Sequence, residues 1–196
     1  KEELMTQAAG IVKTYVCGPT VYDYSHIGHA RTYINFDVLR RYLEATGYEV
    51  THVQNFTDVE EKITEKAREE GVSTKALTQR YIAEYFRDMD ALNVKRATRY
   101  TFASEYVQRI IEITGKLLEG GKAYKSGDTV YFDVQSAGGF GELVKNLEDS
   151  LADKVLLKET GKHGPFDFVL WRASKEGEEG WDSPWGVGRP GWHTEC

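Results

Sequence analysis

The chain has 196 residues, of which 40% are hydrophobic, enough to bury the core of one domain or of a domain with an insertion. Its 25 basic and 31 acidic residues give a net charge of −6, whereas a free-standing nucleic-acid-binding domain is usually basic. No apolar run approaches the roughly 20 residues that cross a bilayer. The first ten residues do not resemble a signal peptide, and we expect a cytoplasmic protein without a membrane partner.

A strand, a turn and a helix are predicted at the start of the chain. Residues 13–17 are rich in aromatic and β-branched side chains, and residues 28–44 place apolar side chains at helical spacing. Ser25 is the expected N-cap of this helix. The unpaired N–H groups and the positive dipole end of a helix suit phosphate. The candidate phosphate-binding residues at this helix start are His26, Ile27, Gly28 and His29.

The His-x-x-His pattern of His26 and His29 has three interpretations. Two imidazoles can donate hydrogen bonds to phosphate oxygens as charge develops in a transition state. The same spacing also fits two solvated histidines, or half of a metal site. The position between a strand and a helix favours the phosphate interpretation. Gly28 has no side chain, so a flat ring could approach its backbone.

A second strand over residues 48–56 completes a βαβ unit, which implies parallel pairing and a right-handed crossover. Ligands of such sheets bind beyond the carboxyl ends of the strands. Cys17 and residues 55–58 should therefore lie near the two histidines. In this segment Asp58 is expected to cap a helix over residues 59–70, and Thr57 could line the pocket.

The predicted secondary structure changes after about residue 100. Helices are expected after Ser73 and Ser104, then two short strands and a polar, Gly-rich stretch with a short helix near residues 143–151. We expect an α/β organisation in three parts. These are the first half of a nucleotide-binding catalytic domain over residues 1–99, an insertion over residues 100–165, and a truncated return segment over residues 166–196.

The two cysteines, Cys17 and Cys196, leave several possibilities open. A buried, inert thiol is the default for Cys17. A disulfide is disfavoured if the chain is cytosolic. Two cysteines far apart in sequence are not a metal motif by themselves, although a zinc site would draw on both. His193 precedes Cys196 by three residues, and that spacing could also chelate a metal ion.

Five segments together resemble the cysteinyl-tRNA synthetases, which are class I enzymes. The resemblance lies in residues 15–23, 26–31, 55–58, 167–171 and 183–196, and His26 to His29 matches the class I His-Ile-Gly-His signature. It implies the first half of a Rossmann-like α/β nucleotide-binding fold, with an α+β connective-peptide insertion.

The resemblance also implies a set of functional residues. Cys17 and Cys196 would bind one zinc ion, with a further His and Glu beyond this chain, which argues against His193 as a ligand. Cys17, Thr57 and Trp192 would form the pocket for L-cysteine. The residues that would bind ATP, as a substrate with Mg²⁺, are His26, Ile27, Gly28 and His29. Because zinc prefers a thiolate to a hydroxyl, it would select cysteine over serine.

The implied reaction joins cysteine to ATP as cysteinyl-adenylate and then transfers the cysteinyl group to tRNA-Cys. The chain lacks the Lys-Met-Ser-Lys-Ser loop of class I enzymes, the last two zinc ligands and a helical tRNA-binding region. We therefore expect a fragment that does not charge tRNA alone, of undetermined oligomeric state. The alternatives are the related cysteine ligase of mycothiol synthesis, a small nucleotidyltransferase, and a non-catalytic excised nucleotide-binding domain.

Overall fold

A computed structural model describes residues 4–139, 161–175, 178–192 and 194. The chain divides into two compact units, Lys1–Glu105 and Tyr106–Cys196, and each is described by itself. None of the helices within the described residues is long and apolar enough to cross a membrane.

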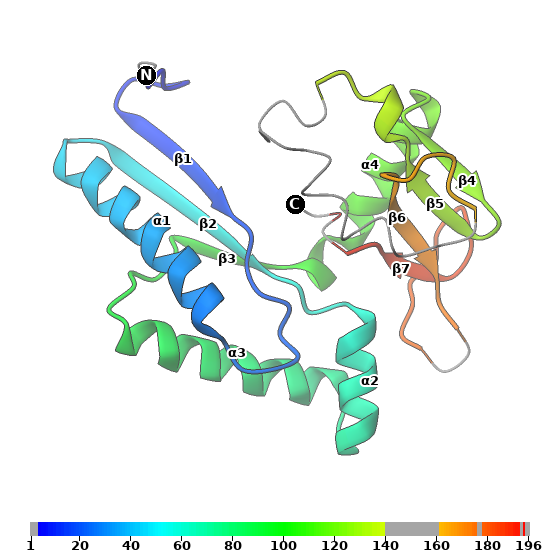
Figure 1. Ribbon diagram of the computed structural model, residues 1–196, viewed down its shortest axis with the longest axis horizontal. Coiled ribbons are helices and arrows are strands. Elements are labelled where there is room, and N and C mark those ends of the chain that lie inside the picture. Colours follow the sequence, from blue (N-terminus) through cyan, green and yellow to red (C-terminus); the bar gives the residue numbers. More distant parts are fainter. Residues whose placement is uncertain (1–3, 140–160, 176–177, 193, 195–196) are drawn as a thin grey trace. The chain divides into compact units, whose positions relative to one another are not determined.

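The first unit is built on a three-stranded parallel sheet with the order β1-β2-β3 (Figure 1). Its strands are β1 (Ile11–Val16), β2 (Glu49–Phe56) and β3 (Arg99–Phe102). The helix α1 (Ile27–Ala45) runs back along the sheet and joins β1 to β2 (Figure 1). This arrangement confirms the predicted βαβ unit, in which the carboxyl ends of β1 and β2 lie at the same edge of the sheet.

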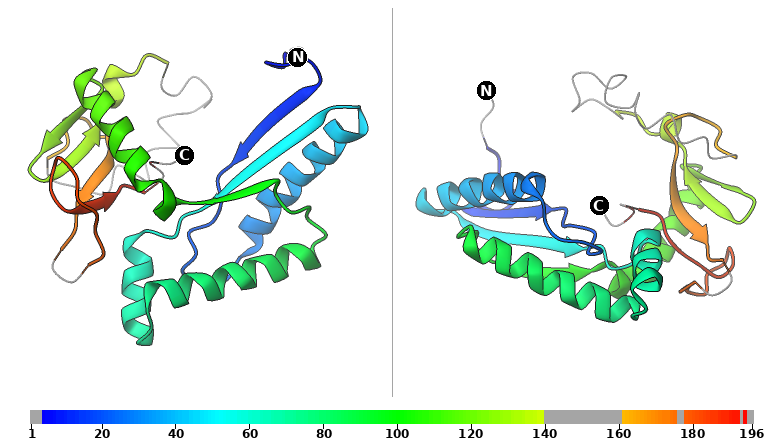
Figure 2. Two further views of the ribbon diagram at one scale, coloured as in Figure 1. Left: turned by 180° about the vertical axis from the view of Figure 1, so that it is seen from behind. Right: turned by 60° about the horizontal axis from the view of Figure 1, so that its bottom comes forward.

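Two further helices, α2 (Glu61–Glu70) and α3 (Thr74–Ala91), connect β2 to β3. The connections from β1 to β2 and from β2 to β3 advance in the same direction across the sheet. Because crossovers between parallel strands are right-handed, α1 and α3 lie on the same face of the sheet. A cavity lined by residues of α1, β2, α3 and β3 agrees with this placement, which Figure 2 shows from two further sides. Phe56 is fully buried, and its ring lies 5.2 Å from that of Tyr85 and 5.4 Å from that of Tyr100.

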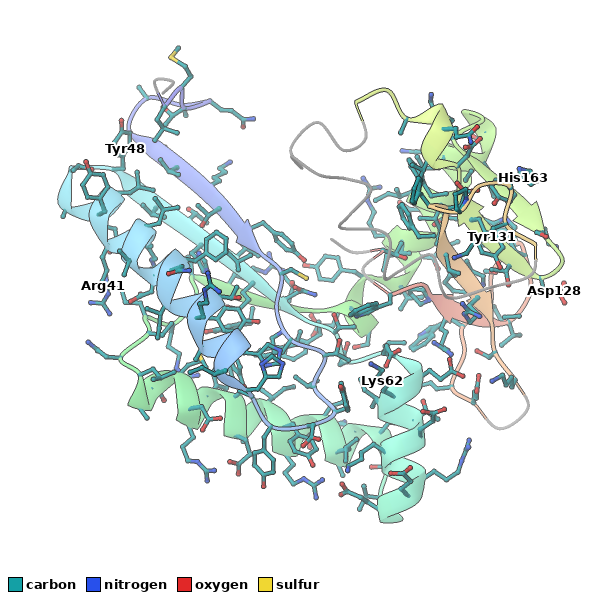
Figure 3. The ribbon with its side chains drawn as sticks, viewed as in Figure 1. Arg41, Tyr48, Lys62, Asp128, Tyr131 and His163 are labelled. Carbon is teal, nitrogen blue, oxygen red and sulfur yellow. The ribbon has the colours of Figure 1, made fainter. Side chains whose placement is uncertain are left out.

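Polar contacts hold α1 to the loop between α3 and β3. Arg40 donates to the carbonyl oxygen of Arg96, and Arg41 donates to that of Asn93, both at 2.7 Å. Figure 3 shows Arg41 on α1. The backbone of Asn93 has a φ of 56°, a left-handed conformation that asparagine tolerates better than most residues. The arginines thus pair carbonyl groups of the loop that leads into β3.

Two predicted helix caps are wrong. The N-cap of α1 is His26 rather than Ser25, because the imidazole of His26 itself accepts from the backbone of the first turn. The N-cap of α2 is Glu60 rather than Asp58. The carboxylate of Asp58 instead accepts from the backbone N–H of Ser104 at 2.9 Å and from its hydroxyl at 2.6 Å. Asp58 therefore ties the end of β2 to the residues that follow β3.

The second unit packs the helix α4 (Val107–Glu119) against a four-stranded antiparallel sheet. The strands, in spatial order, are β4 (Ala123–Ser126), β5 (Thr129–Phe132), β6 (Phe168–Ala173) and β7 (Gly188–Pro190). The short 3₁₀ helices are Ala103–Tyr106 and Val134–Ser136. The strand β6, which belongs to the expected return segment, pairs with β5 and β7. The helix expected near residues 143–151 lies outside the described residues.

A buried carboxylate organises the loop that precedes β6. Asp167 is 2% exposed and accepts from the Tyr124 hydroxyl at 2.6 Å, the Gly164 N–H at 2.8 Å and the Val134 N–H at 3.1 Å. The ring of His163, labelled in Figure 3, stacks on Tyr124 with a centroid distance of 3.6 Å. Burial and the hydrogen bond to Asp167 raise the pKa of Tyr124 to about 12. The loop thus has a fixed hydrogen-bonded anchor.

The pairing of β1 with β2 continues beyond the last residues of both strands. Thr57 donates its N–H to the carbonyl of Pro19 at 3.1 Å, and Val21 donates to the carbonyl of Thr57 at 3.3 Å. Between these bonds and the sheet, the N–H of Gly18 meets the side-chain oxygen of Asn55 at 2.6 Å. A Cβ on Gly18 would lie 1.6 Å from the carbonyl oxygen of Asn55. Only a glycine therefore permits this close approach.

Replacing Gly18 with alanine should force the two strand ends apart. We expect Gly18→Ala to lower the free energy of unfolding by about 3 kcal/mol, the upper part of the range for overpacked sites. Gly115 lies inside α4, where an added Cβ meets nothing within 4 Å. Gly115→Ala should therefore raise stability by about 0.5–1 kcal/mol. Urea unfolding followed by circular dichroism measures both, and a Gly18→Ala chain as stable as the wild type would contradict the close approach.

Candidate nucleotide-binding site at the strand ends

The two histidines of the signature cap their own helix. The Nδ1 atom of His26 accepts from the N–H of Gly28 at 3.1 Å, and the Nδ1 atom of His29 accepts from the N–H of His26 at 3.2 Å. This is a reciprocal capping box in which imidazoles replace the usual hydroxyl and carboxylate. The rings stack with a centroid distance of 3.9 Å and an interplanar angle of 16°. The two imidazoles thus have a capping role that the sequence did not predict.

These hydrogen bonds assign the tautomer of both imidazoles. A backbone N–H can only donate, so each Nδ1 atom must carry a lone pair instead of a proton. A neutral imidazole with an unprotonated Nδ1 carries its proton on Nε2. His26 and His29 therefore each have an Nε2–H donor that the cap does not use. Such donors at a helix N-terminus are suited to phosphate oxygens.

The space beside Gly28 and the burial of His29 also determine the arrangement of this helix start. A Cβ on Gly28 would lie 2.8 Å from the Cε1 atom of His26, so a side chain there would displace the capping imidazole. His26 and Gly28 are exposed, and Ile27 is 87% exposed. His29 is half-buried, and burial together with the neighbouring His26 lowers its pKa. His29 is therefore held in the neutral form that the cap requires.

Tyr33 links the helix to Cys17. The ring of Tyr33 lies 6.5 Å from that of His29 and nearly parallel to it, and its hydroxyl donates to the carbonyl oxygen of Cys17 at 3.4 Å. Tyr33 is 4% exposed, and burial raises its pKa far above the ordinary value. Cys17 follows β1 directly and is partly exposed, which does not fit the default interpretation of a buried core thiol. The backbone of Cys17 is thus tied to the helix that carries the histidines.

Thr57 follows β2 on the same sheet edge and is 2% exposed. Besides the backbone pairing with residues 19–21, its hydroxyl oxygen accepts from the side-chain NH₂ of Asn55 at 3.3 Å. The structure therefore brings His26, His29, Cys17 and Thr57 to the carboxyl ends of neighbouring parallel strands. This is the edge at which open α/β sheets bind ligands.

The place of the remaining predicted site residues beside this group stays a prediction. Trp192 is 58% exposed and belongs to the second unit. Cys196 and His193 lie outside the described residues, so the proposed pairing of Cys196 with Cys17 stays a prediction. Within the described part of the chain, no three His, Cys, Asp or Glu side chains are grouped to hold a metal ion.

The contacts of two positioning residues were not predicted from the sequence. Nothing in the spacing of Tyr33 reveals its contact with Cys17, and Asn55 was expected near the histidines without a role of its own. Asn55 carried a weak signal, because asparagine is disfavoured in strands and this one stands near the end of β2. A buried amide at such a position has to find partners, which here are Gly18 and Thr57.

A parallel α/β sheet with a His-Ile-Gly-His helix start at the carboxyl ends of its strands points to the catalytic domain of a class I aminoacyl-tRNA synthetase. The family model for the "tRNA synthetases class I (C) catalytic domain" matches residues 3–196. The chain belongs to this family.

Relatives of known name agree with this assignment. The chain is 51% identical to a cysteine--tRNA ligase of Clostridioides difficile over 198 residues, which cover 100% of this chain and 42% of that protein. It is 52% identical to a cysteine--tRNA ligase of Pyrococcus furiosus over 198 residues, which cover 100% of this chain and 41% of that protein. The chain therefore spans well under half the length of these relatives.

Solved structures of low sequence identity show the same fold. Methionyl-tRNA synthetase of Mycobacterium tuberculosis, in complex with methionyl-adenylate, matches with a TM-score of 0.63 and 18% identity, over 90% of this chain and 44% of that one. A LeuRS–tRNA complex of Agrobacterium radiobacter matches with a TM-score of 0.52 and 24% identity, over 66% of this chain and 17% of that one. The Rossmann-like fold predicted from the sequence is confirmed.

The capping role of His26 can be separated from its free Nε2 donor. Asparagine offers a side-chain oxygen in place of Nδ1 and is a good N-cap, whereas alanine has no acceptor. We expect His26→Ala to be less stable than His26→Asn by about 1 kcal/mol. Chemical unfolding of the two variants measures this difference, and equal stabilities would contradict the capping box.

The lowered pKa of His29 makes stability depend on pH. In the unfolded chain the imidazole of His29 takes up a proton near pH 6.5, whereas in the folded chain it does so at a lower pH. Between these two pH values the unfolded state therefore binds more protons than the folded state. The stabilisation is complete above about pH 6.5 and is lost as the pH falls below it. The pKa of His52 is lowered as well, by burial and then by Arg40, so His52 contributes to the pH dependence of stability with the same sign.

We therefore expect His29→Asn to reduce the rise in unfolding free energy between about pH 5 and pH 7 without abolishing it, because His52 remains. Urea unfolding at a series of pH values measures the slope. An unchanged slope in His29→Asn would show that His29 does not contribute.

Proposed function

We propose that this chain is part of the catalytic domain of a cysteine--tRNA ligase. The relatives described above carry that name, and the observation that carries the proposal is the capped histidine pair at the ligand-binding edge of the sheet. The pair supplies two Nε2–H donors beside a helix N-terminus. The substrates would be L-cysteine, ATP with Mg²⁺ and tRNA-Cys, in the cytoplasm.

The first step activates the amino acid. A carboxylate oxygen of cysteine attacks the α-phosphorus of ATP, the bond to the bridging oxygen of the β-phosphate breaks, and pyrophosphate leaves with the electron pair. In the second step a hydroxyl of the terminal adenosine of tRNA attacks the carbonyl carbon, and AMP leaves. The contribution of His26 and His29 is to stabilise negative charge that builds up on the phosphate oxygens in the first step.

Cys17 fits the proposed selection of cysteine. It is a partly exposed thiol at the strand end, next to the Thr57 backbone pairing, and a thiolate is a ligand that zinc prefers. Cys17 would hold a zinc ion, together with Cys196 and two further ligands. When bound, zinc would favour the thiolate of cysteine over the hydroxyl of serine. Tyr33 would keep the backbone of Cys17 in place through its hydrogen bond.

Cysteine-dependent exchange of pyrophosphate into ATP by the full-length protein that carries this sequence tests the first step. We expect exchange with cysteine and much slower exchange with serine. His29→Asn keeps an acceptor for the N–H of His26 but lacks the Nε2 donor, so we expect kcat to fall by about 10²–10³-fold. His163→Asn, an exposed imidazole of the second unit, is the matched control and should leave exchange unchanged.

Absence of cysteine-dependent exchange in the wild-type protein would overturn the proposed function. Equal effects of His29→Asn and His163→Asn would overturn the role of the histidine pair. Supplying either tRNA-Cys or an amino-sugar acceptor in the second step separates the proposed function from that of the mycothiol-pathway ligase. We expect transfer to the tRNA alone.

A further inference from the structure

We infer that Asn55 is a positioning residue for the cysteine pocket, because its buried amide holds the backbone beside Cys17 and the hydroxyl of Thr57 at the same time. This inference rests on the proposed function and adds a residue that the predicted pocket did not contain. Asn55 would act through Cys17 and Thr57 rather than through contact with the substrate.

The contacts of Asn55 are those of a bridge between two strand ends. Asn55 is 2% exposed, and its Oδ1 atom accepts from the N–H of Gly18 at 2.6 Å. Its Nδ2 atom donates to the hydroxyl oxygen of Thr57 at 3.3 Å. Gly18 follows Cys17 directly, so one amide group contacts both predicted sides of the pocket.

The orientation of this amide is determined by its partners. The N–H of Gly18 requires an acceptor, and an amide NH₂ group cannot accept, so the oxygen must face Gly18 and the NH₂ must face Thr57. The hydrogen bond to Thr57 then restrains the rotamer of its side chain. A displacement of about 1 Å in a substrate-positioning group can cost on the order of 100-fold in rate.

A purely structural role would not require an asparagine. Buried strand positions favour β-branched side chains, and a buried amide contributes to stability only if its hydrogen bonds are made. Strands β1 and β2 are also already joined by six paired residues and by the backbone bonds of Thr57. The presence of an asparagine here is therefore better explained by a role in positioning Gly18 and Thr57.

Gln54 provides a matched control within the same strand. It is 3% exposed and donates from Nε2 to the hydroxyl of Tyr85 at 2.7 Å. Because successive side chains of a strand point to opposite faces, Gln54 faces α3 and Asn55 does not. Gln54→Ala removes a comparable buried amide and leaves in place the hydrogen bonds that Asn55 makes with Gly18 and Thr57.

The test is cysteine-dependent ATP–pyrophosphate exchange by the full-length enzyme, with KM measured separately for cysteine and for ATP. Asn55→Asp keeps the acceptor for Gly18 and loses the donor to Thr57. Asn55→Ala loses both. We expect each variant to raise the KM for cysteine by about tenfold, equivalent to one or two lost hydrogen bonds, and to leave the KM for ATP nearly unchanged. Gln54→Ala should leave both KM values nearly unchanged.

A double-mutant cycle tests whether Asn55 acts through Thr57. Thr57→Val removes the hydroxyl and should raise the KM for cysteine in the wild-type background. In the Asn55→Ala background the same substitution should add little, because the two residues share one interaction. If Asn55→Ala does not fold, the cycle is measured with Asn55→Asp.

The inference is overturned if the Asn55 variants raise the KM for ATP as much as that for cysteine, if Gln54→Ala has the same effect, or if the effects of Asn55 and Thr57 multiply independently. Wild-type enzyme that lacks cysteine-dependent exchange would overturn the proposed function itself, and the inference with it. The two failures are thus distinguished by the activity of the wild-type enzyme.

Discussion

The site depends on the continued parallel pairing of two chain segments beyond the ends of β1 and β2. Backbone bonds of Thr57 to residues 19–21, and the bond from Gly18 to Asn55, keep the segments adjacent where regular strands would diverge. Because Gly18 has no side chain, the backbones approach more closely there than other residues allow. This contact keeps Cys17 and Thr57 at the same edge of the sheet, and α1 begins after the short loop that follows.

The start of α1 shows how one pair of side chains can have a structural and a chemical role. The Nδ1 atoms of His26 and His29 satisfy backbone donors that every helix start leaves unpaired. The same bonds use only the Nδ1 atoms and leave the Nε2 atoms of both imidazoles available for a ligand. A serine or aspartate cap would satisfy the helix equally well but would leave no such donors. Gly28 contributes to this cap, because the absence of a side chain leaves room for the His26 ring.

Local patterns predicted the elements well, and the contacts between them poorly. Helical spacing predicted α1, but Leu43 is 6% exposed whereas Val38 and Tyr42 are 60% and 65% exposed, because spacing defines faces without saying which one is covered. Ser25 and Asp58 are good caps by propensity. They were displaced because neighbouring side chains, His26 and Glu60, reach the same N–H groups. Motif residues indicated the site, but Asn55 and Tyr33 act across the fold, which no local pattern records.

The central claim is that the strand ends and the histidine cap together form the site for the adenylate of cysteine. A crystal structure of the full-length enzyme with a non-hydrolysable cysteinyl-adenylate analogue tests it most directly. We expect the group that replaces the phosphate to lie within hydrogen-bonding distance of the Nε2 atoms of His26 and His29, and the analogue's thiol to lie beside Cys17 and Thr57. An analogue bound away from these residues, or histidines that have left the cap to turn away from it, would contradict the account.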